Sequence, residues 1–231
     1  MFIRITLFGI WAACLAFSAQ AQVSVGASIG ANYSFWGWHV KNPLLDVGYT
    51  EDPGFGYRAA AVADWQISPV IGLRADLAYQ IWRNSTALVL QFPRDSAGQI
   101  PPTVRGKSSE RFHNFAGSLL ACISPFRQKH IYFLAGVTAT SITEAWFTIT
   151  IEDDGPFPGG YTSSTSIDLK NYNRTQVFAD FGGGVKFPLG AKGSLFSEIR
   201  YQLPLTNLWG SDNVDASVSP LLLNVGYLFQ L

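Results

Sequence analysis

The chain has 231 residues, of which 14% are aromatic and only 14% are charged, and its formal net charge is zero. Soluble domains usually carry about 25% charged residues, so the surface is short of charge for a soluble protein. A neutral chain also lacks the basic footprint of a nucleic-acid-binding protein, so nucleic acid is excluded as an expected partner. The length suits one sizeable unit, and no linker rich in serine, proline or charge divides it.

The N-terminus has the pattern of an export signal. Arg4 precedes an apolar run from Ile5 to Phe17, which is followed by Ser18-Ala19-Gln20-Ala21. One positive charge, a short apolar core and an Ala-x-Ala ending predict a Sec-type signal peptide over residues 1–21. A retained membrane helix is the alternative, but the run is short for a span. A lipoprotein is another alternative, but the residues before Cys14 match a lipobox poorly.

Residues 22–231 are expected to form the single mature domain. Cys122 is then the only cysteine, so no intrachain disulfide is expected, and a small apolar filler is favoured there over a nucleophile. No later stretch reaches about 18 uninterrupted apolar residues, so no transmembrane helix is expected. An exported, aromatic-rich, charge-poor chain without helices meets the requirements of a membrane β-barrel.

The first predicted strand, residues 23–35, alternates strictly between apolar residues on one face and small or polar residues on the other. The apolar face consists of Val23, Val25, Ala27, Ile29, Ala31, Tyr33 and Phe35. Apolar residues facing lipid and small residues facing a narrow lumen suit a barrel, although a soluble sandwich strand would also alternate.

Seven more strands are predicted along the chain. They cover residues 55–67, 70–82, 110–123, 130–142, 174–187, 194–203 and a last segment that follows 204–213 and ends at 231. The facing of strand 110–123 stays open because its alternation is weak. The connections alternate between long and short, as in an even-stranded barrel with short periplasmic turns and longer external loops. Residues 146–151 and 161–169 are expected to form a hairpin above the membrane, and its entry into the sheet would make ten strands.

The last eleven residues, 221–231, again have one fully apolar face. That face consists of Leu221, Leu223, Val225, Tyr227, Phe229 and Leu231. A free apolar edge strand invites aggregation. In a barrel the last strand pairs with the first, which removes the edge and turns the apolar face to lipid. We therefore predict closure between residues 221–231 and 23–35.

Aromatic residues concentrate at the ends of the predicted strands, which indicates two girdles at the membrane interfaces. They are Phe35, Trp36, Trp38, Phe55, Tyr57, Trp65, Trp82, Phe126, Trp146, Phe187, Trp209 and Tyr227. A soluble sandwich with core aromatics is the alternative, but it leaves the outward apolar rows unexplained.

Eight charged residues within the predicted strands fall on the inward parity. They are Arg58, Asp64, Arg74, Asp76, Asp180, Lys186, Glu198 and Arg200. A charge facing lipid at mid-membrane costs about 2–4 kcal/mol, and an eight-stranded interior is just filled by side chains. We expect a salt-bridged plug, with Asp64 directly opposite Arg74 and Asp180 near Arg200. A selectivity lining or a proton path is the alternative interpretation.

No catalytic residue, cofactor site or metal site is assigned. The three histidines are His39, His113 and His130, and no partner for acid–base chemistry is evident beside them. The acidic run at 152–155 lacks the spacing of a calcium loop, and the glycine run at 182–184 lacks a phosphate-binding spacing.

The C-terminus carries a family resemblance. Asn224, Gly226, Phe229 and Leu231 match the polar, glycine, aromatic and hydrophobic positions of the signal read by the barrel-assembly machinery, with leucine where phenylalanine is usual. From about residue 23 to 231 the chain resembles the small outer-membrane β-barrel proteins of the porin family, of the OmpX/OmpA type. The resemblance implies a place in the Gram-negative cell outer membrane and recognition by the assembly machinery, and it implies no ligand or activity.

The sequence thus predicts an all-β fold, a single antiparallel transmembrane up-and-down β-barrel of eight strands, with ten as the alternative. The expected function is that of a non-enzymatic integral barrel with a plugged lumen and long extracellular loops as an interaction surface. A small passive diffusion channel is the alternative, and a lipid-modifying enzyme is the third hypothesis. Outer-membrane lipid and, during biogenesis, the barrel-assembly machinery are the expected partners.

Overall fold

The computed structural model describes residues 22–40, 48–90, 104–125, 130–151, 160–190, 192–210 and 214–231. The predicted signal peptide, Phe126 and the acidic run at 152–155 lie outside these residues. Within the described part of the chain, no helix has the length and apolarity to cross a membrane.

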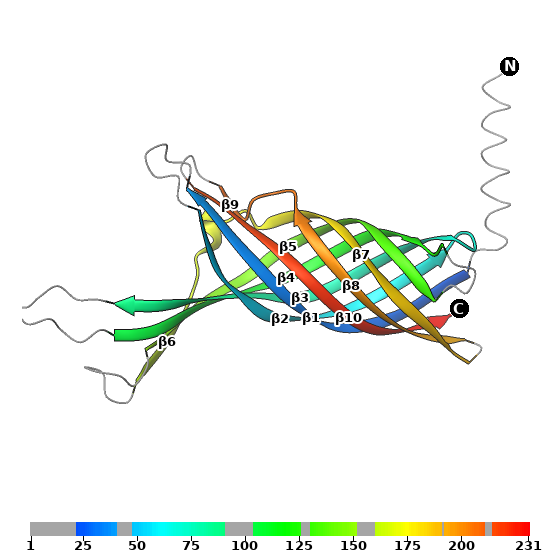
Figure 1. The fold of residues 1–231 in the computed structure, drawn as a ribbon, viewed down its shortest axis with the longest axis horizontal. Coiled ribbons are helices and arrows are strands. Elements are labelled where there is room, and N and C mark those ends of the chain that lie inside the picture. The colour runs from blue at the N-terminus through cyan, green and yellow to red at the C-terminus, as the bar shows by residue number, and fades with distance from the viewer. Residues whose placement is uncertain are drawn as a thin grey trace, which may run out of the picture.

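Eight antiparallel strands of the described chain close into a ring (Figure 1). They are β1 (Gln22–Val40), β2 (Gly48–Gln66), β3 (Ile71–Leu90), β4 (Val104–Ile123), β5 (Ile131–Ile151), β7 (Thr175–Leu189), β8 (Gly193–Pro204) and β10 (Val214–Gln230). Among the described residues, β6 (Tyr161–Ser166) pairs with β5 alone, and the short β9 (Trp209–Gly210) pairs with β10. Because β6 stays outside the ring, the eight-stranded prediction is confirmed and the ten-stranded alternative is wrong.

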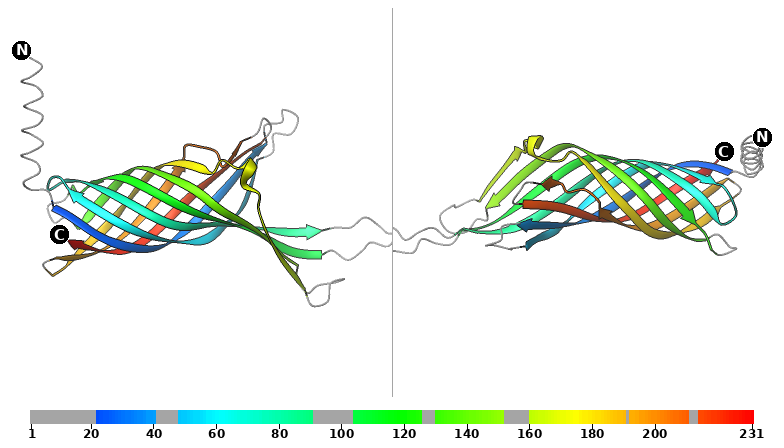
Figure 2. Two further views of the ribbon diagram at one scale, coloured as in Figure 1. Left: turned by 180° about the vertical axis from the view of Figure 1, so that it is seen from behind. Right: turned by 90° about the horizontal axis from the view of Figure 1, so that it is seen from above.

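The ring is sealed by β1 and β10, as the alternation at the two ends of the sequence predicts. Their register runs from Ser24 opposite Gln230 to Val40 opposite Val214. The start of β1 and the end of β10 lie at the same end of the barrel as the short connections after β2, β4 and β7 (Figure 2). Short turns mark the periplasmic end of such barrels, so this end faces the periplasm.

At the opposite end, several strands are longer than predicted. The β3–β4 pairing continues in register to Leu90 opposite Val104, and β5 runs on to Ile151, where it pairs with β6. The four strands β3, β4, β5 and β6 therefore form a sheet that projects beyond the ring, here called the extension (Figure 1). The predicted hairpin is confirmed as the pairing of β5 with β6. The sequence placed the strand ends too early because the apolar alternation stops at the membrane surface, whereas the backbone pairing does not.

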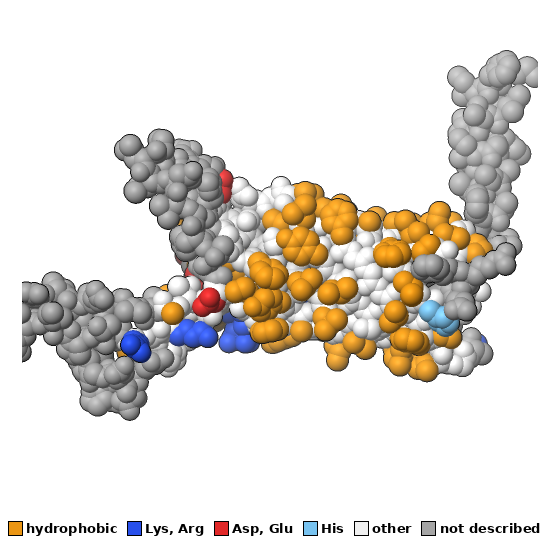
Figure 3. All heavy atoms as spheres, in the orientation of Figure 1, with side chains coloured by type: hydrophobic (Ala, Val, Ile, Leu, Met, Phe, Trp, Pro, Cys, Tyr) orange, Lys and Arg blue, Asp and Glu red, His pale blue; other side chains and the backbone are white. Residues whose placement is uncertain are grey.

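The predicted outward faces are confirmed except at Ile81, and apolar side chains cover the barrel wall in a broad band (Figure 3). β4 turns Phe115 and Leu119 outward and Phe112 and Leu120 inward. Because both faces of β4 carry apolar residues, its alternation is weak in the sequence. Ile81 was expected on the lipid face but is buried, beside the irregular β2–β3 pairing between Pro53 and Arg58.

The girdle prediction is wrong for two tryptophans. Trp36 on β1 and Trp82 on β3 are buried inside the barrel. They occupy the inward parity of their strands, and parity, not closeness to a strand end, decides which way a side chain points. Seven of the predicted aromatics are exposed: Phe35, Phe55, Tyr57, Trp65, Trp146, Phe187 and Tyr227.

Candidate functional site: the filled lumen

The eight charged residues of inward parity all point into the barrel. Six of them are fully enclosed, whereas Asp64 and Lys186 lie nearer the periplasmic mouth. They are carried by β2, β3, β7 and β8, so the charges of four strands meet in one interior.

The first ion pair forms across the tight β2–β3 turn. Asp64 lies directly opposite Arg74 in the register, as predicted. Arg74 donates from Nε to Asp64 Oδ1 at 2.6 Å and from Nη2 to Oδ2 at 2.9 Å. Lys186 Nζ, from β7, donates to the same Oδ2 at 2.7 Å. The planar guanidinium of Arg74 thus binds both oxygens of the Asp64 carboxylate, and the Lys186 ammonium binds one of them as well. Together they hold the carboxylate in one orientation.

From Arg74 the ion pairs cross the lumen. Its Nη1 donates to Glu198 Oε2 on β8, which also accepts from the Tyr132 hydroxyl at 3.0 Å. Glu198 pairs in turn with Arg200, whose Nη1 lies 2.6 Å from Asp76 Oδ2. Arg58 is the last member of the series, with its Nη2 3.3 Å from the same Asp76 oxygen. The result is a chain of alternating sign, here called the charge chain: Lys186, Asp64, Arg74, Glu198, Arg200, Asp76 and Arg58.

Asp180 has a different set of partners. In the β7–β8 register it lies opposite Gln202, while Arg200 lies opposite Gly182, two positions along. Its carboxylate accepts hydrogen bonds from Gln202 Nε2 at 2.9 Å and from the Thr138 hydroxyl. Arg200 is therefore a diagonal neighbour of Asp180 and forms its ion pairs with the charge chain. The expected closeness of Asp180 to Arg200 leads to no direct pairing.

Two aromatic rings flank the Arg74 guanidinium. Its carbon lies 4.7 Å from the centroid of the Phe196 ring and 5.1 Å from that of Tyr132, within cation–π range. The Phe196 ring lies over Gly226, where an added Cβ would come within 2.4 Å of Phe196 Cζ. Gly226, which the sequence places in the assembly signal, thus also makes room for a ring that packs on Arg74.

We expect Gly226→Ala to lower the free energy of unfolding by about 1–3 kcal/mol, because the new methyl group clashes with the Phe196 ring, which it forces off Arg74, and with the Ala27 carbonyl oxygen at 2.6 Å. Urea titration of the protein refolded in phosphatidylcholine vesicles measures the change. Gly117→Ala is the matched control, since a Cβ there meets nothing nearer than Leu77 Cδ2 at 3.8 Å. Equal effects of the two substitutions would contradict the role of Gly226 as a space for the ring.

A second, apolar layer fills the extracellular half of the lumen. Its buried members, here called the apolar layer, are Trp36, Trp82, Phe112, Ile142, Ala145, Leu169, Phe178, Leu208 and Val218. Trp82 meets Phe178 edge-on with ring centroids 5.7 Å apart, and Trp36 lies 5.1 Å from Phe112. Leu169, in the short helix η1 (Leu169–Asn171), and Leu208 add side chains from outside the ring strands. Sequence reasoning missed this layer, although the inward parity of Trp36 and Trp82 was a usable signal.

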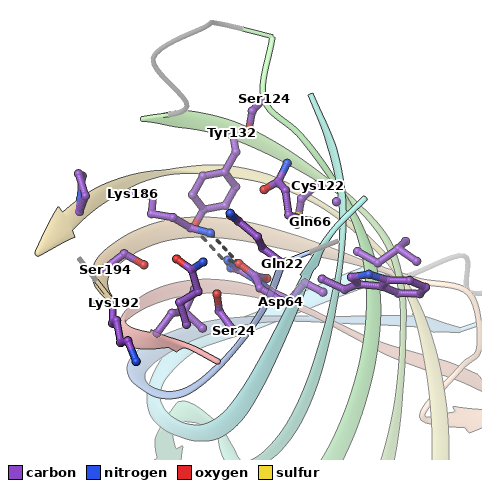
Figure 4. A pocket seen from close by; sticks show the side chains of 18 of the residues that line it. Gln22, Ser24, Asp64, Gln66, Cys122, Ser124, Tyr132, Lys186, Lys192 and Ser194 are labelled. Atoms are coloured by element: carbon purple, nitrogen blue, oxygen red, sulfur yellow. Dashed lines mark hydrogen bonds and ion pairs between the residues drawn. The ribbon is translucent and has the colours of Figure 1, made fainter. Parts of the chain in front are cut away.

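The periplasmic mouth is open to a polar cavity of about 210 Å³ (Figure 4). Lys186, Asp64 and Tyr132 line it, together with Cys122 and Lys192. Lys186 is still 28% exposed there, whereas Arg74 behind it is 1% exposed. The cavity therefore ends at the charge chain.

His113 and His130, the histidines whose side chains the structure describes, do not form a common site. His39 lies in β1, His113 on the outer face of β4 in contact with the Tyr79 hydroxyl, and His130 before β5, near the Lys186 carbonyl oxygen. In the described part of the chain, no three side chains among His, Cys, Asp and Glu gather in a way that would hold a metal ion.

These features define the class of the protein. A ring without edges satisfies its backbone hydrogen bonds internally, and its outer wall is an apolar band, as a β-sheet in lipid requires. The chain is an integral β-barrel protein of the cell outer membrane.

Comparison with known proteins finds solved outer-membrane proteins of low similarity. No protein-family model and no curated protein matches the chain. The attachment invasion locus protein Ail of Yersinia pestis, solved with the heparin analogue sucrose octasulfate, is similar at 12% identity and a TM-score of 0.38, over 90% of this chain and 99% of that one. The outer-membrane protease OmpT of Escherichia coli is similar at 10% identity and a TM-score of 0.42, over 91% and 97%. Neisserial surface protein A is similar at 13% identity and a TM-score of 0.39, over 89% and 97%. Similarity at this level carries no argument about function, so the class rests on the barrel itself.

Proposed function

We propose that the protein is a non-enzymatic outer-membrane barrel with a closed lumen, whose extension and extracellular loops offer the surface for contacts. One observation carries the proposal: the charge chain and the apolar layer fill the lumen one above the other. Arg74 and Arg200 are each 1% exposed, and Trp82 is fully buried.

The two layers obstruct permeation for different physical reasons. A hydrated ion that reaches the apolar layer must lose its water without any compensating partner, which is costly. An apolar solute from the extracellular side meets buried ion pairs, and separating these leaves unpaired charges in a dry interior. The combination supports a closed barrel more strongly than either layer alone.

A small passive diffusion channel is the second candidate, and the cavity at the periplasmic mouth favours it. Lys186 and Lys192 give this vestibule a positive character. The path would have to continue past Arg74, which is held on both sides by Asp64 and Glu198. Rearrangement of these ion pairs is therefore the step that a channel requires.

Planar-bilayer recordings on the purified protein separate the two candidates. We expect no steady conductance from the wild-type protein, because both layers obstruct the lumen. A steady conductance that changes when Arg74 or Arg200 is replaced, but not when the exposed Lys170 is replaced by glutamine, would contradict the closed lumen and establish the channel. The third hypothesis, a lipid-modifying enzyme, is tested separately by lipid A analysis of cells with and without the gene, where we expect identical masses.

We further propose that the C-terminal residues are the address read by the barrel-assembly machinery. Phe229 and Leu231 point outward from β10, where a partner can reach them before insertion. Asn224 and Gly226 point inward, and Asn224 Nδ2 donates to Glu198 Oε1 at 3.3 Å. The outward pair is thus available for recognition, while the inward pair also serves the packing of the lumen.

A further inference from the structure

Basic side chains gather on the outer face of the extension, just beyond the apolar band of the barrel (Figure 3). Arg83 on β3 lies directly opposite Arg111 on β4, and Lys107 and Arg105 follow on the same face of β4. Arg105, Lys107 and Arg111 are exposed, and Arg83 is partly exposed. These four residues are here called the basic face.

The basic face begins where the membrane must end. On β3 the residues of outward parity are apolar or aromatic from Ile71 to Tyr79, a span that matches the 9–11 residues of a tilted transmembrane strand, and Ile81 beyond it is buried. The next outward residue is Arg83. On β5 the residue opposite Arg111 is Trp146, an exposed ring of the kind that settles at the headgroup level. The Arg83–Arg111 pair therefore lies at the level of the outer-leaflet headgroups.

The charges of the basic face are not balanced within the described chain. Like charges directly opposite one another across a strand pair are destabilising. Among the described residues, no carboxylate lies within ion-pair distance of Arg83 or Arg111, and Arg83 Nε is buried without a hydrogen-bond partner. Glu144 and Asp52, the nearby acids, lie opposite His113 and Ser85 in the register. Two arginines that lie opposite one another in the register, without a carboxylate in ion-pair contact, form a site for a doubly accepting anion.

We propose that Arg83 and Arg111 bind the phosphate group of an outer-leaflet lipid headgroup, with Lys107 and Arg105 extending the site away from the membrane. Guanidinium groups bind phosphate through paired N–H donors. Trp146 flanks the site at the interface, and the barrel wall below it receives the acyl chains of the same lipid. An anion placed between the two arginines removes their mutual repulsion.

The test uses the full mature chain, purified and placed in phosphatidylcholine nanodiscs that contain diphosphorylated lipid A. The lipid A that stays bound per protein is measured by mass spectrometry as the lipid is titrated. We expect Arg83→Gln/Arg111→Gln to bind lipid A about 30-fold more weakly than wild type, because each basic residue near a membrane surface contributes about one kcal/mol. We also expect the difference to shrink in high salt.

Three controls keep the result interpretable. Lys170→Gln/Arg174→Gln removes the same charge from the segment between β6 and β7 and is expected to bind as wild type does. Arg83→Lys/Arg111→Lys keeps the charge and is expected to retain most of the binding. Heat-modifiable gel mobility verifies that each variant is folded.

The proposal is overturned if the glutamine double variant binds lipid A as wild type does, or if the Lys170/Arg174 control loses as much. If dephosphorylated lipid A binds as tightly as diphosphorylated lipid A, the contact is made by the acyl chains and the phosphate has no role in it. Displacement of lipid A by inorganic phosphate at equal concentration would show a site for the free anion and not for a lipid.

Discussion

Replacing Arg74 by methionine is expected to lower the free energy of unfolding by about 3 kcal/mol or more, because removing one partner of a buried ion pair leaves uncompensated charge. Arg74 is the only member of the charge chain that joins Asp64 to Glu198. Asp64 keeps Lys186, and Glu198 keeps Arg200 and the Tyr132 hydroxyl, so the expected loss lies at the lower end of the range for buried pairs. Urea titration in phosphatidylcholine vesicles, followed by tryptophan fluorescence, measures it.

Two further variants separate charge from packing at Arg74. Asp64→Asn/Arg74→Met removes one charge of each sign, keeps Glu198 paired with Arg200, leaves only the partly exposed Lys186 without its carboxylate, and is expected to recover part of the lost stability. Lys170→Met breaks the exposed pair with Asp168 and is expected to change little, since solvent screens it. A loss below about 1 kcal/mol for Arg74→Met would mean that the charge chain does not stabilise the lumen.

Deleting Phe229 to Leu231 is expected to leave export intact and to reduce the folded protein in the outer membrane by at least about tenfold, because unsatisfied backbone groups in lipid each cost several kcal/mol. The deletion removes the pairing of Phe229 with Val25 and the hydrogen bond from Leu231 N to Val23 O at 3.0 Å. Fractionation of cells, followed by gels with and without heating, measures the outer-membrane and the folded amounts.

The matched control for the deletion is Leu231→Phe. It keeps the backbone and an apolar outward side chain, so we expect normal levels of folded protein. Normal levels of the truncated protein would show that the periplasmic end of the β1–β10 seam is dispensable for both recognition and closure.

The barrel was predictable from sequence because its main constraint is local. In β1 and β10 each residue faces either lipid or lumen, so the period of two determines the facing of every side chain. The same parity predicts that Arg74 points inward, and the tight turn before β3 predicts its register with Asp64.

The contacts across the lumen were not predictable in this way. Arg74 on β3 meets Glu198 on β8, from the opposite side of the ring. Which residues of two opposite strands lie at the same height depends on the stagger that accumulates around the barrel. No local pattern in the sequence records that stagger. Asp180 is a different case: the register of the β7–β8 hairpin, set by its short turn, places it opposite Gln202, two positions from the expected arginine.

The apolar layer and the extension were missed for different reasons. Trp36 and Trp82 were assigned by their closeness to strand ends, although their parity already indicates an inward position. The extension lies outside the membrane, where neither face of a strand has to be apolar. Residues of β3 beyond Arg83, which include the unbroken apolar run Ala87–Leu90, therefore keep the backbone pairing of a strand without the alternation of apolar and polar residues.

The β1–β10 seam has a consequence for the time course of folding. It joins Ser24 to Gln230, two residues from opposite ends of the chain, whereas every other seam joins successive strands of the ring, with only β6 or β9 between them in two cases. Contacts of such high sequence separation form slowly, because the chain must first bring distant segments together. One edge of β1 therefore stays unpaired until β10 has formed. During that interval the open edges of both strands are exposed to pairing with other chains.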